Sequence, residues 1–222
     1  MSSLDGSQIE IVSFDADDTL VKRKLVNKFW FEEIPKRYAE KHGVKFEEAL
    51  RTARRSYDEI GDEDLRWYKP SYWFDRFDLD EDPKRVVERI QKPENLRLYE
   101  DALDLTANLE GKYILVVTSN SPRIFLDYAL RRIEDRFHGI YSCVSDFGEV
   151  KKHVGVYQKV LNRVGVSPDC SVHIGDHREF DYRIPKRLGM TAFYIERSGG
   201  EIAKEDGIIT DLREVENKKD KS

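Results

Sequence analysis

Residues 9–19 read IEIVSFDADDT, a short apolar run that ends directly in a group of acids, and this stretch decides the fold. The run is rich in β-branched and aromatic residues, which is typical of a strand buried on both faces of a parallel sheet. Asp15, Asp17 and Thr19 follow it. Ligands of open α/β sheets bind beyond the carboxyl ends of the strands. We therefore expect these side chains to lie at a functional edge.

Four more apolar runs of this kind occur later in the chain, at residues 113–117, 140–144, 171–174 and 191–195. Between them, apolar residues recur at helical spacing. One example is Val156, Val160 and Val164, a stripe that Gly165 should end. Strands that alternate with helices predict βαβ units, and hence an α/β fold with a doubly wound parallel sheet.

Residues 22–93 interrupt this alternation because they contain helical patterns but no strand-like run. Trp30, Ile34 and Tyr38 share one helical face, although Pro35 should kink or restart that helix. Roughly 70 residues are too many for an ordinary crossover connection. We interpret them as a helical domain of residues 22–93, inserted into an α/β domain of residues 1–21 and 94–222. The many aromatic residues of the insert should form most of its small core.

Composition restricts the possible classes. The chain has 222 residues, of which 39% are hydrophobic and 36% charged, and it has two cysteines. Its 43 acids and 38 bases give a net charge of −5, which argues against a nucleic-acid or acidic-membrane partner. No apolar run approaches the roughly 20 residues of a membrane span, and the N-terminal residues do not resemble a signal peptide. We expect a cytoplasmic protein whose cysteines are free thiols.

Reactive side chains also follow the other predicted strands. The second strand leads to Thr118, Ser119 and Asn120, the third to Lys151 and Lys152, and the fourth to Gly175, Asp176 and Asp181. Because parallel strands end at the same edge of a sheet, carboxylates, hydroxyls and an ammonium group should converge there. No single motif is decisive, and the joint placement carries the prediction.

With these residues in this order, the sequence resembles the phosphatase branch of the haloacid dehalogenase superfamily. Residues 15–19 match the D-x-D-x-T motif, and residues 175–181 match G-D-x-x-x-x-D. A hydroxyl residue at the end of the second strand and a lysine after the third complete the pattern. The resemblance implies a Rossmann-like core with strand order 5-4-1-2-3. It also implies that the insert is an α-helical C1-type cap domain.

The resemblance further implies roles for individual residues. Asp15 would be the nucleophile that forms an aspartyl-phosphate, and Asp17 the general acid and base. Thr118 and Lys151 would hold the phosphoryl oxygens. Ser119 is the alternative to Thr118, and Lys152 the alternative to Lys151.

A metal site follows from the same resemblance. Mg²⁺ would be bound by Asp15, by Asp17 through its backbone carbonyl, and by Asp176, since oxygen ligands beside a phosphate favour this ion. Asp181 would support the ligands, and Ser119 and Asn120 would support the site or contact the substrate.

The function expected from these residues is Mg²⁺-dependent hydrolysis of a small phosphorylated metabolite. Asp17 favours a phosphatase over a dehalogenase, because a departing halide needs no proton. A phosphotransferase or phosphomutase of the same superfamily shares every motif, and a non-catalytic phosphate-binding module is the alternative from another class. The sequence indicates neither the physiological substrate nor the oligomeric state.

Overall fold

The computed structural model describes residues 9–197, 199 and 206–217. Its centre is a parallel sheet in the order β3-β2-β1-β4-β5-β6. This confirms the α/β fold and the predicted order, which is extended by one strand. The strands are β1 (Ile11–Phe14), β2 (Ile114–Ser119), β3 (Gly139–Ser142), β4 (Ser171–Gly175), β5 (Thr191–Ile195) and β6 (Ile208–Ile209). β6 was not predicted, because a strand of two residues carries no recognisable pattern of apolar residues.

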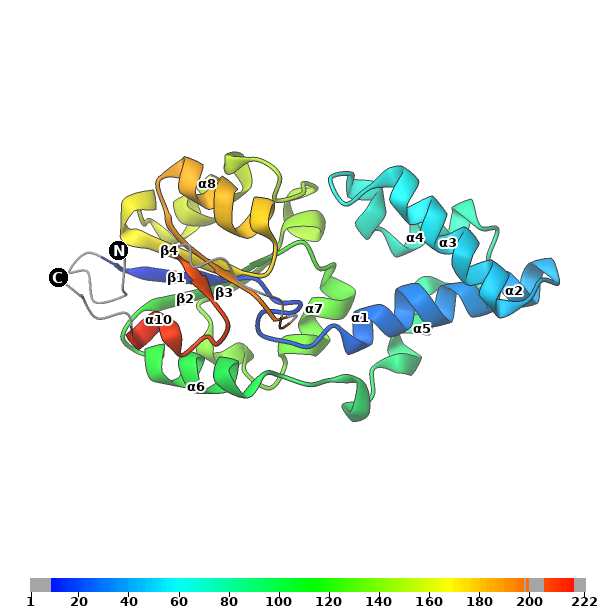
Figure 1. Cartoon of the computed structure of the whole chain (residues 1–222), viewed down its shortest axis with the longest axis horizontal. Coiled ribbons are helices and arrows are strands. Elements are labelled where there is room, and N and C mark those ends of the chain that lie inside the picture. Colours follow the sequence, from blue (N-terminus) through cyan, green and yellow to red (C-terminus); the bar gives the residue numbers. More distant parts are fainter. Residues whose placement is uncertain (1–8, 198, 200–205, 218–222) are drawn as a thin grey trace.

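Helices cover both faces of the sheet (Figure 1). Side chains alternate between the faces along each strand. Val12 and Phe14 belong to an apolar cluster with α6 and α7, whereas Ile11 belongs to a second cluster with α8. The helices after β1 and its insert are α6 (Glu100–Leu109), α7 (Arg123–Leu130), α8 (Val154–Val164), α9 (Ile184–Leu188) and α10 (Glu214–Asn217).

Three strands end at other residues than the last residues of the predicted apolar runs. β2 continues to Ser119, and β4 continues by one residue to Gly175. β3 stops at Ser142, because the side chain of Ser142 accepts a hydrogen bond from the N–H of Ser145 and begins the π-helical turn η5 (Cys143–Phe147). Residues 143 and 144 were therefore wrongly assigned to this strand. Cys143 and Cys170 are both free, as expected.

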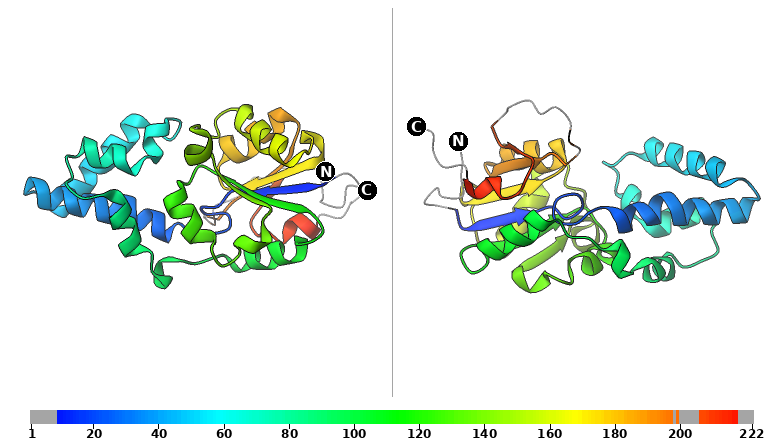
Figure 2. Two further views of the ribbon diagram at one scale, coloured as in Figure 1. Left: turned by 180° about the vertical axis from the view of Figure 1, so that it is seen from behind. Right: turned by 60° about the horizontal axis from the view of Figure 1, so that its bottom comes forward.

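The described residues between β1 and the 3₁₀ turn η3 (Pro93–Asn95) form no strand of the sheet. Their main elements are α1 (Lys24–Lys28), η1 (Phe29–Glu33), α2 (Ile34–His42), α3 (Phe46–Ile60), η2 (Leu65–Tyr68), α4 (Pro70–Arg76) and α5 (Pro83–Ile90). Pro35 lies in the first turn of α2, so the helix restarts there after the π-helical turn η1. The helices of this insert extend from one end of the sheet, and α10 lies at the opposite end (Figures 1 and 2).

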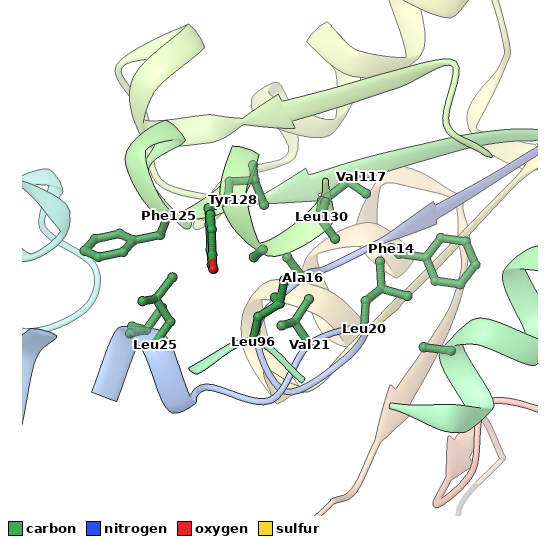
Figure 3. Close-up of a cluster of buried hydrophobic side chains, with 14 of the residues drawn as sticks. Phe14, Ala16, Leu20, Val21, Leu25, Leu96, Val117, Phe125, Tyr128 and Leu130 are labelled. Atoms are coloured by element: carbon green, nitrogen blue, oxygen red, sulfur yellow. The ribbon is translucent and has the colours of Figure 1, made fainter. Parts of the chain in front are cut away.

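Aromatic side chains fill the insert. The ring of Tyr57 lies edge-on to Trp73 with the ring centres 4.6 Å apart, and its hydroxyl donates to the carbonyl of Trp30 at 3.0 Å. The insert is joined to the sheet by the apolar cluster that contains Val12 and Phe14, where Leu25 of α1 lies beside Phe125 of α7 (Figure 3).

No helix in the described part of the chain is both long and apolar enough to cross a membrane.

Candidate active site

A cavity of about 280 Å³ lies between the carboxyl ends of β1, β2 and β4 and the helical insert. The sheet side contributes predicted site residues, namely Asp15, Asp17, Ser119, Lys151, Asp176 and Asp181. The insert contributes Arg23, Asp62 and the rings of Trp30, Trp67 and Tyr68. One cavity thus joins the predicted chemical groups to an aromatic wall.

The backbone after β1 fixes the first two acids. The N–H of Asp15 donates to the carbonyl of Ile174 at 2.8 Å and continues the pairing of β1 with β4 beyond Phe14. The chain then folds back, and the carbonyl of Ala16 accepts the N–H groups of Leu20 and Val21 at 2.9 Å and that of Thr19 at 3.3 Å. The carboxylates therefore stand on a hydrogen-bonded loop.

Lys151 reaches the centre of the site and is only 2% exposed. Its ammonium group donates to Asp15 Oδ1 at 2.5 Å, to Asp181 Oδ1 at 2.6 Å and to the carbonyl of Thr118 at 3.0 Å. Burial acts to lower the pKa of Lys151, but the two carboxylates raise it well above its ordinary value. The alternative residue Lys152 is part-exposed and does not line the cavity.

Asp181 is held by groups on several sides. Its Oδ1 atom lies 3.0 Å from His173 Nε2 and also accepts from the hydroxyl of Tyr157 at 3.3 Å. Its Oδ2 atom accepts the N–H of His177 at 3.0 Å. A Cβ at Gly175 would collide with this carboxyl group. Burial acts to raise the pKa of Asp181, but the charge of Lys151 and the bond to His173 lower it.

The structure places the two hydroxyl residues at the end of β2 differently. Thr118 was the preferred candidate for holding the substrate, yet its side chain is fully buried and accepts a hydrogen bond from Ser13 Oγ at 3.0 Å. Side chains alternate along a strand, and Ser119, not Thr118, lines the cavity. The geometry therefore favours the alternative assignment to Ser119.

A group of buried polar side chains beneath the site was not predicted from the sequence. Ser13 of β1 lies opposite His173 of β4 in the sheet, with Ser13 Oγ 2.9 Å from His173 Nδ1. Both residues are at most 2% exposed, and burial lowers the pKa of His173. Polar contacts therefore connect Ser13 through His173 and Asp181 to Lys151. The one sign of this group in the sequence is a histidine within the otherwise apolar residues 171–174.

The acids facing the cavity are poorly compensated. Burial raises the pKa of Asp15, opposed by Lys151. Burial, together with the charges of Asp15 and Asp181, raises the pKa of Asp176 well above its ordinary range. Burial also raises the pKa of Asp17 to about 6, with Arg23 acting in the opposite direction. Carboxyl groups shifted in this direction favour a bound proton or a nearby cation.

The donor set fits a divalent cation. One carboxylate oxygen each of Asp15, Asp176 and Asp181 lie within 4.8 Å of one another. Oxygen donors in an acidic cluster are what Mg²⁺ prefers. Because Asp181 is already bonded to Lys151, His173 and a backbone N–H, Asp15 and Asp176 are the carboxylates most available to an ion. The carboxylate of Asp17 is not part of this group.

Two contacts connect the insert to the sheet across the cavity. Asp62 Oδ2 lies 3.3 Å from His177 Nε2, and the amide Nδ2 of Asn120 donates to the hydroxyl of Tyr68 at 3.3 Å. The other end of the Asn120 amide accepts the N–H of Lys151 at 2.9 Å. Asn120 therefore links the position of the buried lysine to the aromatic wall.

Residues 9–189, which include every predicted site residue, match the family of haloacid dehalogenase-like hydrolases. The chain belongs to this family. Its sheet order agrees with the resemblance seen in the sequence. Membership of this hydrolase family establishes the general type of enzyme, and the family includes members with different substrates.

Among solved structures, a haloacid dehalogenase (HAD) phosphatase from Thermococcus onnurineus superposes with a TM-score of 0.83 at 23% identity, covering 94% of this chain and 97% of that one. The haloacid dehalogenase-like hydrolase domain-containing protein 3 of Xenopus laevis is 23% identical over 207 residues, 84% of each chain. The GMP/IMP nucleotidase YrfG of Escherichia coli is 32% identical over 72 residues. That match spans about a third (32%) of the nucleotidase.

Proposed function

We propose that this hydrolase is a Mg²⁺-dependent phosphatase that cleaves a small phosphorylated metabolite through an aspartyl-phosphate on Asp15. The observation that carries the proposal is the pair Asp15 and Asp17 on one fixed loop, facing the same cavity as Lys151 and Asp176. A nucleophile and a separate acid on the same strand end are what ester cleavage requires.

Asp15 is the proposed nucleophile. Its Oδ1 atom is held by the ammonium group of Lys151, so Oδ2 is free to attack phosphorus. The bond from phosphorus to the ester oxygen then breaks, and Asp17 gives its proton to the leaving alkoxide. A water molecule that Asp17 deprotonates next attacks phosphorus, releases inorganic phosphate and restores the Asp15 carboxylate. A pKa of about 6 suits Asp17 to both proton transfers near neutral pH.

The phosphoryl oxygens need donors, and two residues on the sheet side of the cavity can supply them. Lys151 is fixed between Asp15 and Asp181, and Ser119 lines the same cavity. We assign to Ser119 the role first expected of Thr118. Thr118 instead contributes its carbonyl, which positions the ammonium group of Lys151. Donors that are fixed before the reaction stabilise charge as it develops in the transition state.

Mg²⁺ would be held by Asp15 and Asp176, with the backbone carbonyl of Asp17 as the third protein ligand that the family resemblance implies. The ion supplies charge that offsets the phosphoryl oxygens and the acids around them. The fit rests on the oxygen-only donor set and on the raised pKa values of Asp15 and Asp176.

We further propose that residues 22–93 form a cap domain over the α/β domain of residues 1–21 and 94–222. The support is that the aromatic wall of the cavity comes from this segment and that Asp62 and Tyr68 contact the sheet across the cavity. A cap in this place excludes water from the reaction.

The test is release of phosphate from p-nitrophenyl phosphate by wild type, Asp15→Asn and Asp18→Asn. Asp15→Asn removes the nucleophile, and activity should fall by on the order of 10⁴-fold or more. Asp18→Asn is the matched control, because Asp18 lies on the same loop with φ 54°, a conformation that Asn tolerates. It should keep its activity. Removal of Mg²⁺ with a chelator should abolish turnover of the wild type. Full turnover by Asp15→Asn would refute the assigned nucleophile.

A further inference from the structure

Arg23 brings an unused cation to the cavity. Its guanidinium Nε is buried, and none of the residues that the structure describes is a hydrogen-bond partner of it. The ion pair that Arg23 makes within the described residues is long, 3.9 Å from Nε to Asp18 Oδ2. The side chain as a whole is 39% exposed, so a ligand in the cavity can reach it. A guanidinium carries five donors in a planar fork that matches carboxylates and phosphates.

Arg23 begins a row of three residues that line the cavity. Arg23 precedes α1, Val26 lies in α1 and Trp30 in η1. Spacings of three and four residues place side chains on one face of a helix. Trp30 is 3% exposed and packs against Phe125, so it forms a fixed wall. The row offers the cavity a cation, an apolar side chain and an aromatic ring.

Contacts within the site place the two cations beside different acids. Lys151 is bonded to Asp15 and Asp181. Arg23 contacts Asp18, with its backbone N–H donating to Asp18 Oδ1 at 3.3 Å and its Nε 3.9 Å from Asp18 Oδ2. Asp18 directly follows Asp17, the residue proposed to protonate the leaving group, and Asp17 lines the same cavity as Arg23. Burial acts to lower the pKa of Arg23, but Asp17 and Asp176 act to raise it, which agrees with this placement.

We infer that Arg23 binds a second anionic group on the organic part of the substrate, a carboxylate or another phosphate close to the reacting ester. The inference rests on the proposed phosphatase function and deepens it, because it names the class of substrate. Val26 and Trp30 then contact the rest of the organic group.

The test compares matched pairs of phosphate esters. 2-Phosphoglycerate and glycerol 2-phosphate differ in a carboxylate, and ethylene glycol bisphosphate and monophosphate differ in a second phosphate. In at least one pair, wild type should prefer the member with the second anionic group by roughly 10- to 100-fold in kcat/KM. This is the range expected for hydrogen bonds to a charged group. The pair that shows the preference identifies the anion.

Arg23→Met keeps much of the apolar stem of the side chain and removes the charge. It should abolish the preference, mainly by raising KM for the member with the second anionic group. The kcat/KM for the member without that group should be nearly unchanged. Arg23→Lys should recover part of the preference because it restores the charge without the planar fork. Thermal unfolding of each variant monitors the fold.

Two results would overturn the inference alone. One is release of phosphate by wild type from both members of each pair at similar kcat/KM. The other is an equal loss on both members in Arg23→Met, since Arg23 would then serve the phosphoryl group or the fold. If wild type releases phosphate from none of these esters, nor from p-nitrophenyl phosphate, the proposed phosphatase function fails and the inference fails with it.

Discussion

The sheet edge and the helical insert bury opposite kinds of side chain. At the sheet edge, the ammonium group of Lys151 is enclosed with the carboxylates of Asp15 and Asp181, all at most 6% exposed. In the insert the interior is aromatic, with Trp73 fully buried. Its charges, such as the pair Glu81 and Arg89, face solvent.

This difference separates two tasks. Buried charges cost free energy unless they are paired, so a cluster of them in the sheet is better explained by chemistry than by stability. Aromatic burial stabilises a small helical module, and the same rings provide a wall for the organic part of a ligand. The four predictions below test this comparison, beginning with the largest expected effect.

Asp17→Asn should lower kcat by about 10²- to 10⁴-fold, the usual contribution of a general acid. The loss should be smaller with p-nitrophenyl phosphate than with an alkyl phosphate, because nitrophenolate leaves without a proton. Steady-state rates on both esters measure the difference. Equal losses on the two esters would contradict a role in protonating the leaving group.

Lys151→Met should lower the free energy of unfolding by about 3–5 kcal/mol, because Asp15 and Asp181 lose their buried partner. Lys159→Met is the control. Lys159 pairs with Glu149 on the surface, both side chains being about half exposed (46% and 45%), and such pairs contribute about 0–1 kcal/mol. Denaturant titration measures both, and similar losses would mean that the buried cluster is not special.

Ile34→Val in the insert and Ile174→Val in the sheet should each cost about 0.5–1.5 kcal/mol, because both side chains are at most 1% exposed. Both residues belong to one continuous apolar cluster, so calorimetry should show a single transition that either substitution shifts. Two transitions, each sensitive to only one substitution, would show that the insert and the sheet unfold separately.

Glu81→Gln should have the smallest effect, a loss of under about 1 kcal/mol near neutral pH, because solvent screens this pair. The bond to Arg89, aided by Arg37, lowers the pKa of Glu81 to about 2 from 4.5. A carboxyl group with a lowered folded-state pKa stabilises the fold above its ordinary pKa. The difference between wild type and variant should therefore shrink as the pH falls from about 4.5 to 2, and a difference that grows there would contradict the assignment.

Sequence predicted the sheet well because continuous apolar runs follow directly from burial on both faces. The acids and the lysine of the site were predictable for a related reason, since parallel strands deliver their following residues to one edge. The choice between Thr118 and Ser119 was not predictable, because neighbouring residues of a strand point to opposite faces of the sheet and a shift of one residue exchanges them. The contacts of His173 were not predictable either, because they depend on the register that places it opposite Ser13.

The insert was predicted as helical but its cavity wall was not. Trp30 was grouped with Ile34 and Tyr38 on one face, and the face it shares with Arg23 and Val26 became visible only once the helix was placed against the sheet. Which side of a helix meets a cavity depends on packing between distant segments, and helical periodicity carries no such information.

All three tryptophans of the chain, Trp30, Trp67 and Trp73, lie in the insert. Trp30 and Trp67 line the cavity, and Trp73 lies behind them against Tyr57. Tryptophan fluorescence therefore comes from the insert alone, and the residues of the sheet do not contribute when indole is excited selectively. A ligand that enters the cavity should change the emission of the first two residues over a constant background from the third. Tryptophan fluorescence can therefore be used to measure ligand binding in the cavity without an added label.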